Sequence, residues 1–120
     1  MRQFVIAGTA TAALAAGCVA APLDAAVPDD VDVQVVAEDI YFEPDRIEVL
    51  PGEVLTLHLR NEGGIVHDLV LEDGWESGDV DPGSAITVEF GPFSASTVAW
   101  CSIPGHRDAG MELQVVVVDD

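Results

Sequence analysis

Short segments in which apolar and polar residues alternate fill most of the chain between residues 31 and 118. In VLTLHLRN (54–61), the leucines fall on one face of an extended chain, and Thr56, His58 and Arg60 fall on the other. This period of two is typical of a half-buried β-strand. Similar segments, separated by turn-forming residues, occur at 31–37, 46–50, 67–72, 85–90, 96–101 and 111–118. The sequence therefore predicts an all-β protein, an antiparallel sandwich or barrel of about seven to eight strands.

The segment EDGWESGDVDPGS (72–84) interrupts this pattern, and its acidic and glycine-rich composition predicts a loop. We expect Trp75 in this loop to cover an edge of the sandwich rather than to dock a partner. His58 lies between Thr56 and Arg60 on the polar face of its predicted strand, so we expect it to be an exposed strand residue without a functional role.

The charge of the chain limits its partners. There are 22 acidic residues against four arginines, and the formal net charge is −18. Nothing in this composition can neutralise nucleic-acid phosphates, so nucleic acid is excluded as a partner. The acidity favours a positively charged protein partner at modest ionic strength. It also suits a high-salt habitat that screens self-repulsion, and a halophilic source is our hypothesis.

The first residues read as a targeting segment. Residues 1–18 hold one positive charge and a short apolar run without any acid, which is the composition of a signal peptide. They end in Leu-Ala-Ala-Gly-Cys, which resembles the lipobox of exported lipoproteins, where Cys18 is acylated and becomes the mature N-terminus. An uncleaved membrane anchor and ordinary cleavage just after Cys18 remain as alternatives. All three place the protein outside the cytoplasm, either anchored on the outer face of the membrane or periplasmic. Residues 19–30 then form an acidic tether, and 31–120 form the folded domain.

Three potential metal donors lie along one loop. Cys101, His106 and Met111 are spaced five residues apart, and Pro104-Gly105 lies between the first two. Because this loop joins two predicted strands, its donors should gather at one end of the sandwich. A fourth donor, His67, begins a predicted strand after a Gly-Gly turn, and in a Greek-key sandwich it can lie beside the loop.

The chemistry of these donors indicates copper. One thiolate and two imidazoles with a weak axial thioether make up a blue-copper electron-transfer site, whereas zinc prefers more Cys or His and has little use for Met. Each residue alone could be structural, with Cys101 and Met111 in the core and His106 in solvent. Their joint spacing favours a metal site. A disulfide between Cys18 and Cys101 is disfavoured, because each cysteine has a separate explanation.

On these residues the chain resembles the cupredoxins, in particular the plastocyanin-like, halocyanin-like and sulfocyanin-like small blue copper proteins. The resemblance rests on three stretches: Ile40-Tyr41-Phe42-Glu43-Pro44 continued by Ile47-Glu48-Val49-Leu50-Pro51-Gly52-Glu53, Asn61…His67-Asp68, and Cys101…Pro104-Gly105-His106…Gly110-Met111. It implies a cupredoxin-like Greek-key β-sandwich that holds one type 1 copper ion. The ligands that it implies are His67, Cys101, His106 and Met111, with Asn61, Asp68, Pro104 and Gly105 in supporting positions.

Two departures from the family pattern concern the surroundings of the ligands. The spacing from Cys101 to His106 is longer than in many plastocyanins and is more similar to sulfocyanin-type or azurin-type loops. Asp68 stands where the family often has Asn. We expect its side chain to accept a backbone N–H and its charge to lower the reduction potential, with Arg107 acting in the opposite direction.

The resemblance implies a one-electron carrier that acts outside the cytoplasm. Its partners would be redox proteins, such as a cytochrome or a terminal oxidase, and we expect a monomer. In these proteins the C-terminal ligand His presents its edge to solvent within an apolar patch. Here that residue would be His106, surrounded by Ile103, Pro104, Ala109 and Gly110.

Two other function classes compete with the electron carrier. A copper enzyme with this fold needs a second copper centre with several more histidines, and His58 is the only one to spare. A binuclear copper centre needs a second Cys in the ligand loop, and residues 102–105 contain none. A copper storage or delivery module, or a scaffold domain without catalysis, stays open as the alternative.

Overall fold

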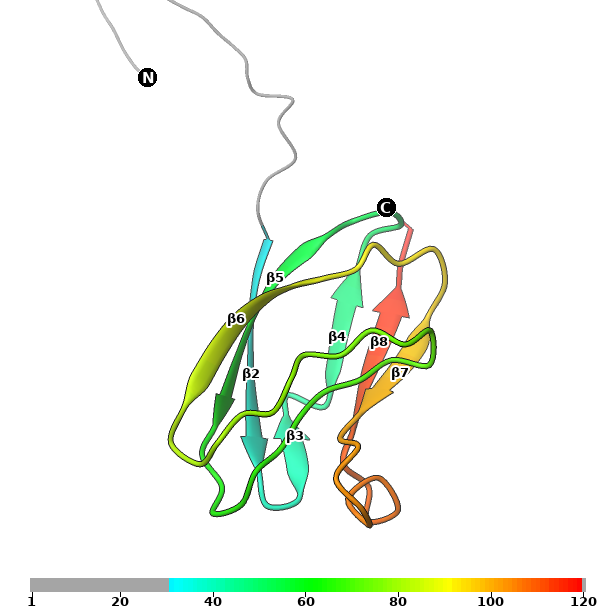
Figure 1. Ribbon diagram of the computed structural model, residues 1–120. Coiled ribbons are helices and arrows are strands. Elements are labelled where there is room, and N and C mark those ends of the chain that lie inside the picture. The colour runs from blue at the N-terminus through cyan, green and yellow to red at the C-terminus, as the bar shows by residue number, and fades with distance from the viewer. Residues whose placement is uncertain (1–30, 120) are drawn as a thin grey trace, which may run out of the picture.

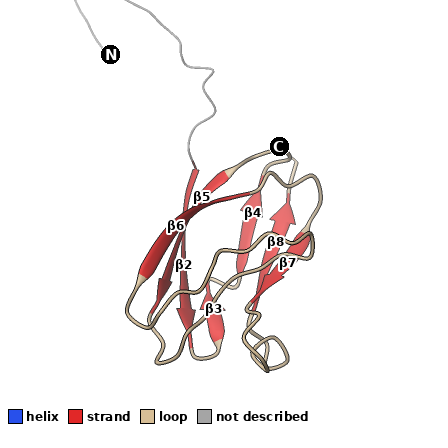
Figure 2. Ribbon diagram, viewed as in Figure 1, coloured by secondary structure: helices blue, strands red, loops and turns tan. Residues whose placement is uncertain are grey.

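The computed structural model describes residues 31–119, which form seven strands and no helix (Figure 2). The strands form a four-stranded sheet with the order β3-β2-β5-β6 and a three-stranded sheet with the order β4-β8-β7 (Figure 1). Their bounds are β2 (Val31–Glu38), β3 (Tyr41–Glu43), β4 (Arg46–Val49), β5 (Leu55–Asn61), β6 (Ala85–Phe90), β7 (Thr97–Trp100) and β8 (Glu112–Val117). The predicted all-β sandwich is confirmed.

The predicted targeting segment (1–18), the tether (19–30) and the acylation site Cys18 lie outside the described residues, so they stay predictions. Among the residues that are described, no helix has the length and apolar character needed to cross a membrane.

One predicted strand was wrong, and one observed strand was not predicted. Residues 67–72 form no regular strand, because their backbone N–H groups bond to scattered partners and not to one neighbouring strand. His67 donates to Val80, Leu69 to Ser77 Oγ over 2.9 Å, and Val70 to Trp100. Only isolated bridges remain in this segment. The short strand β3 was missed, since three residues are too few to display a period.

The sheets are mixed rather than antiparallel. β2 runs parallel to β5, and β4 runs parallel to β8. The remaining pairs, β2 with β3, β5 with β6 and β7 with β8, are antiparallel as expected. After β3 the chain crosses to the second sheet for β4 and returns as β5, which explains how β2 and β5 can lie side by side in the same direction.

The core forms where the apolar faces of the two sheets meet. β5 follows its predicted alternation, with Leu55, Leu57 and Leu59 buried at 1% exposure or less. Trp75 packs against Phe90 with the ring centroids 4.8 Å apart, so it covers the sandwich as predicted. His58 lies on the outer face of β5 as predicted, where its ring nitrogens are 3.1 Å from Asp32 Oδ1 and 3.1 Å from Thr87 Oγ1.

The loops at one end of the sandwich carry the expected metal donors. The β2–β3 turn, the loop after β5 and the loop that joins β7 to β8 meet at this end (Figure 1). The first residues of β2 and the last residues of β8 lie at the opposite end (Figure 1).

Replacing Leu57 by alanine should test how much the core depends on β5. Leu57 is fully buried on a strand that is paired on both sides. Because the change leaves a cavity, we expect it to lower the free energy of unfolding by about 2–5 kcal/mol in a urea titration. Val54→Ala, at a position that is 43% exposed, should cost about 0.5 kcal/mol or less. Equal effects of the two changes would contradict this description of the core.

Candidate metal centre

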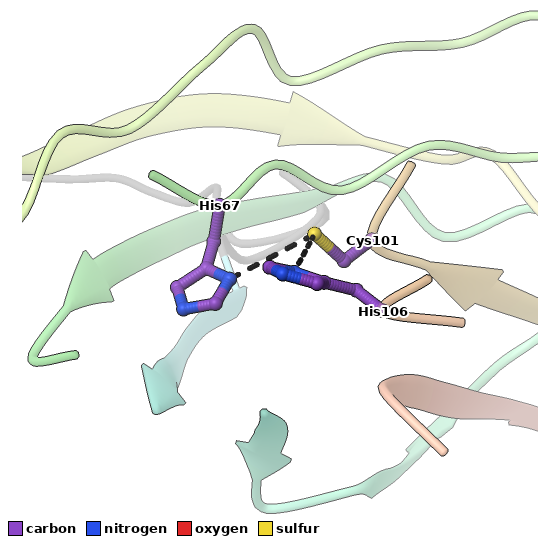
Figure 3. Close-up of side chains that lie close together, drawn as sticks. All are labelled: His67, Cys101 and His106. Atoms are coloured by element: carbon purple, nitrogen blue, oxygen red, sulfur yellow. Dashed lines mark hydrogen bonds between the residues drawn. The ribbon is translucent and has the colours of Figure 1, made fainter. Parts of the chain in front are cut away.

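Three of the four expected donors converge in a buried cluster. The donor atoms of His67, Cys101 and His106 lie within 4.8 Å of one another. Cys101 Sγ is 3.8 Å from Nδ1 of His67 and 3.4 Å from Nδ1 of His106 (Figure 3). The two imidazole rings are tilted by 51°, with centroids 5.1 Å apart. Donors that share one metal ion at bond lengths of about 2.0–2.3 Å must lie roughly 3–4 Å apart, so the spacing fits one ion.

A tight turn brings His106 back toward Cys101. Pro104 and Gly105 occupy the two central positions of the turn, and the His106 N–H closes it on the Ile103 carbonyl over 3.0 Å. Gly105 has φ +84°, which suits the third position of a type II turn, and proline suits the second. The expected supporting role of Pro104 and Gly105 thus has a local cause: together they reverse the chain between two donors.

Met111 is fixed to the same loop by its backbone. Its N–H donates to the His106 carbonyl over 3.1 Å, and its carbonyl accepts the Cys101 N–H over 3.2 Å. The side chain is fully buried. The fourth expected donor is therefore in hydrogen-bonding contact with two of the others through the main chain, immediately before β8.

His67 is held by an antiparallel bridge and by a buried amide. His67 and Val80 exchange two backbone hydrogen bonds, of 3.2 and 2.8 Å. Asn61 is fully buried, and its Nδ2 donates over 2.8 Å to the carbonyls of both Ile65 and Val80. Its Oδ1 accepts the Gly63 N–H over 2.8 Å. Asn61 therefore ties both ends of the loop that leads to His67, which is more than the turn-forming role of an ordinary asparagine.

Asp68 connects the His67 segment to the Cys101 loop. One of its carboxylate oxygens accepts the Ser102 N–H over 2.6 Å, and the other accepts the Ser102 hydroxyl. The expectation that Asp68 accepts a backbone N–H is confirmed. The residues that follow two of the donors are thereby linked to each other.

Burial changes the acidity of the central donor. Cys101 is fully buried, and the loss of solvation raises the pKa of its thiol above the ordinary value. The thiolate is the form that binds a metal, so a cation must displace the proton from this site. The neighbouring N–H groups that face the sulfur oppose the shift but do not overcome it.

One residue at the centre was missed by the sequence analysis. Asp39, in the β2–β3 turn, lies with Oδ1 2.8 Å from Nε2 of His67 and Oδ2 2.8 Å from the Gly64 N–H. These two donors, the Gly64 N–H first, hold the pKa of Asp39 below its ordinary value. Among 22 acidic residues, an aspartate in a turn carries no signal of its own. Only the register of β2 against β5 identifies it.

The donor set fits copper better than zinc. A buried sulfur with two imidazoles and a buried methionine beside them combines soft and intermediate donors, which suit both Cu(I) and Cu(II). Structural zinc sites use four Cys or His donors, and within the described residues the cluster offers three. The arrangement can therefore hold one copper ion in a buried site.

Comparison with known proteins agrees with this description. Residues 8–98 match the family model of the Cupredoxin-like domain, a range that ends shortly before Cys101. The copper-resistant cuproprotein CopI of Pseudomonas aeruginosa is 44% identical over 41 residues, which is 34% of this chain. The matched part spans only 23% of that protein.

Solved structures share the fold at low identity. Auracyanin A, a "blue" copper protein of Chloroflexus aurantiacus, superposes with a TM-score of 0.67 and 18% identity, over 75% of this chain and all of that one. The blue copper oxidase of Nitrosomonas europaea gives a TM-score of 0.64 and 17% identity, over 77% of this chain but 40% of that one. The fold thus occurs both as a small protein and as part of a larger enzyme.

Replacing Asn61 by alanine should loosen the His67 loop. The change leaves the Gly63 N–H and the Ile65 carbonyl without their side-chain partner and removes one of the two hydrogen bonds to the Val80 carbonyl, so we expect a loss of about 1–3 kcal/mol in the free energy of unfolding. Gln34→Ala, on the same sheet, is the control. Amide hydrogen exchange should also quicken at Gly63 and Val80 in the Asn61 variant, and unchanged exchange there would contradict the role given to this side chain.

Proposed function

Because the chain belongs to the cupredoxin-like domain family, we propose that it is a mononuclear type 1 copper protein that carries single electrons outside the cytoplasm. The observation that carries this proposal is the buried convergence of Cys101 with two imidazole nitrogens. The family accounts for the sandwich, and the three donors account for the metal. A reading of Cys101 as an inert core thiol leaves the two buried histidines beside it unexplained.

In this proposal His67, Cys101 and His106 would hold the ion, and Met111 would be a fourth and weaker ligand. Bound copper supplies exchange of one electron between Cu(II) and Cu(I). The chain supplies donor atoms that are buried and close together. The backbone hydrogen bonds from Met111 to both Cys101 and His106 keep Met111 at a fixed place in the loop.

His106 is the proposed point of electron exchange. It is 6% exposed, whereas His67 is fully buried, so His106 is the imidazole nearer to solvent. Exposed Pro104, Ala109 and Gly110 lie in the same loop. A small apolar rim of this kind suits brief contact with another redox protein, since weak electron-transfer encounters bury little area.

The charges favour a positively charged partner. Each arginine in the described residues is paired with an acid: Arg46 with Glu48 at 2.7 Å, Arg60 with Glu62 at 3.9 Å, and Arg107 with Glu112 at 3.1 Å. Most of the remaining acids in the described residues are exposed and have no arginine partner. We propose a redox protein such as a cytochrome or a terminal oxidase as the partner of a monomeric carrier, with attraction that weakens as salt is added.

The orientation of the sandwich agrees with a tethered carrier. The chain enters the sandwich at the end opposite the metal donors (Figure 1). An acylated Cys18, or either alternative at the N-terminus, would then hold the protein on the outer side of the membrane with its donor end pointing away. Release of the protein from membranes by a protease, but not by salt, would support the anchored form.

A copper storage or delivery module is the second candidate, and the match to a protein named for copper resistance favours it. A delivery protein hands its ion to an acceptor, whereas a carrier keeps the ion and changes only its charge. Transfer of copper to a chelating acceptor protein within the time of one redox exchange would favour delivery. A copper enzyme is less well supported, because a second copper centre needs further histidines. The one remaining histidine, His58, faces outward and hydrogen-bonds to Asp32 and Thr87.

The visible spectrum tests the proposed function directly, and Cys101→Ser is the variant that tests its centre. The protein loaded with Cu(II) should show an intense visible band from thiolate-to-copper charge transfer, and ascorbate should bleach it. Cys101→Ser should lose the band, because a hydroxyl is no soft donor. The variant should keep its fold by circular dichroism, since the strands hold the core. A colourless protein that still binds copper, or a blue serine variant, would refute the assignment.

Met111→Leu should keep the colour and raise the reduction potential. Leucine nearly conserves volume, so the buried position should tolerate it within about 1.5 kcal/mol. The change removes a donor that favours Cu(II), which makes reduction easier. Voltammetry of both proteins measures the difference, and an unchanged potential would mean that Met111 is not axial.

A further inference from the structure

The register between β2 and β5 places an acidic side chain behind the metal centre. Ala37 lies opposite Asn61 at the end of this parallel pair. The pairing continues one step further, where the Glu62 N–H donates to the Ala37 carbonyl over 2.9 Å. The next residues along the two chains therefore bring Asp39 beside Gly63 and Gly64.

Asp39 spans the loop and reaches the far side of the His67 ring. One carboxylate oxygen accepts the Gly64 N–H, and the other lies 2.8 Å from Nε2 of His67. Because an ionised carboxylate only accepts hydrogen bonds, Nε2 must carry the proton. In the neutral ring the lone pair is then on Nδ1, the atom that is 3.8 Å from Cys101 Sγ.

Gly63 leaves the space that this contact needs. A Cβ atom at position 63 would overlap Asp39 Oδ1, and it would lie 2.8 Å from Asp39 Cγ and 3.1 Å from Nε2 of His67. The neighbouring Gly64 is less crowded, with Asp39 Oδ2 at 3.4 Å from its hypothetical Cβ. The contact between Asp39 and the His67 ring therefore requires glycine at position 63, and the two residues form one structural unit in this sense.

The other carboxylate near the donors does not have this access. Asp68 directs its oxygens to the N–H and hydroxyl of Ser102. It orders the loop but binds neither imidazole in the described structure. Asp39 has the opposite arrangement, since half of its hydrogen bonding goes to an imidazole donor.

We propose that Asp39 is a positioning residue for His67, which fixes the ring with Nδ1 toward Cys101 and, by its negative charge, favours the oxidised ion. The second half of this proposal rests on the copper function proposed above, and the first half does not. A carboxylate behind a ligand imidazole raises the basicity of the ring and holds its orientation. Cu(II) carries one more positive charge than Cu(I), so the carboxylate should stabilise Cu(II) more.

The experiment compares variants of the full-length chain at one mildly alkaline pH. Asp39→Ala removes the acceptor and the charge, whereas Asp39→Asn removes the charge and keeps an acceptor. Glu38→Gln is the matched control, because it removes one charge from the adjacent residue. Gly63→Ala should displace the carboxylate without altering it.

The first readout uses the metal-free protein. Nitrogen NMR should find His67 with its proton on Nε2 in the wild type, in Asp39→Asn and in the control. A mixture of tautomers is expected in Asp39→Ala and Gly63→Ala. Chemical unfolding of each variant shows that it is folded, and Asp39→Asn keeps the test valid if alanine impairs folding.

The second readout uses copper. Competition with a chelator should show Cu(II) bound about 10–100-fold more weakly in Asp39→Ala, with a smaller loss for Cu(I). If Cu(I) binding is unchanged, a tenfold loss for Cu(II) equals about 59 mV of rise in potential for a one-electron couple. Asp39→Asn should fall between the wild type and Asp39→Ala. Gly63→Ala in the Asp39→Ala background should add little, because both changes break the same contact.

The two proposals fail in different ways. A wild type without a blue band would refute the copper function, and the tautomer of the metal-free protein would still decide the positioning of His67. A blue wild type in which Asp39→Ala matches Glu38→Gln in tautomer, affinity and potential would overturn the role of Asp39. Additive effects of Gly63→Ala and Asp39→Ala would separate the glycine from the carboxylate and would contradict the unit that they form.

Discussion

The contact between Val70 and Trp100 is the interaction on which the metal centre depends. Their two backbone hydrogen bonds, of 2.9 and 3.1 Å, join a segment that follows the first sheet to strand β7 of the second. The hydrogen bonds from Ser102 to Asp68 repeat this link closer to the donors. Together these hydrogen bonds hold the His67 segment beside the start of the Cys101 loop.

Residue type and spacing could predict the cluster because its donors lie at chain positions that any strand–turn–strand arrangement brings together. The five-residue steps from Cys101 to His106 and Met111 are local, and the Pro-Gly turn between the first two is visible in the sequence. The expected strand at 67–72 is not a regular strand. Its isolated bridge from Val70 to Trp100 nevertheless places the segment that contains His67 beside the start of the Cys101 loop. Asp39 could not be predicted, because its distance from His67 depends on the parallel register of β2 and β5, and no local pattern encodes that register.

The charged side chains around the cluster differ in whether they contact its donor residues. Arg107 stacks on Trp100 with its guanidinium carbon 3.9 Å from the ring centroid, and it also donates to Glu112 over 3.1 Å. Its guanidinium is therefore held against Trp100, the residue before Cys101. Asp68 accepts hydrogen bonds from Ser102, whereas Asp39 lies within hydrogen-bonding distance of the His67 imidazole. Of these three groups, Asp39 is the one that lies within hydrogen-bonding distance of a donor ring.

The same arrangement explains how a buried polar centre is compatible with a stable core. Burying imidazoles and a thiol costs free energy unless each polar atom finds a partner. The polar atoms of Asn61 and Asp68 satisfy backbone groups, and Asp39 satisfies one side of His67. The atoms left facing the centre are the sulfur and the two Nδ1 atoms. A metal ion bound by these atoms would stabilise the folded protein, because only the folded chain brings the donors together. Since surrounding hydrogen bonds hold the donors, little rearrangement should accompany a change of the ion's charge.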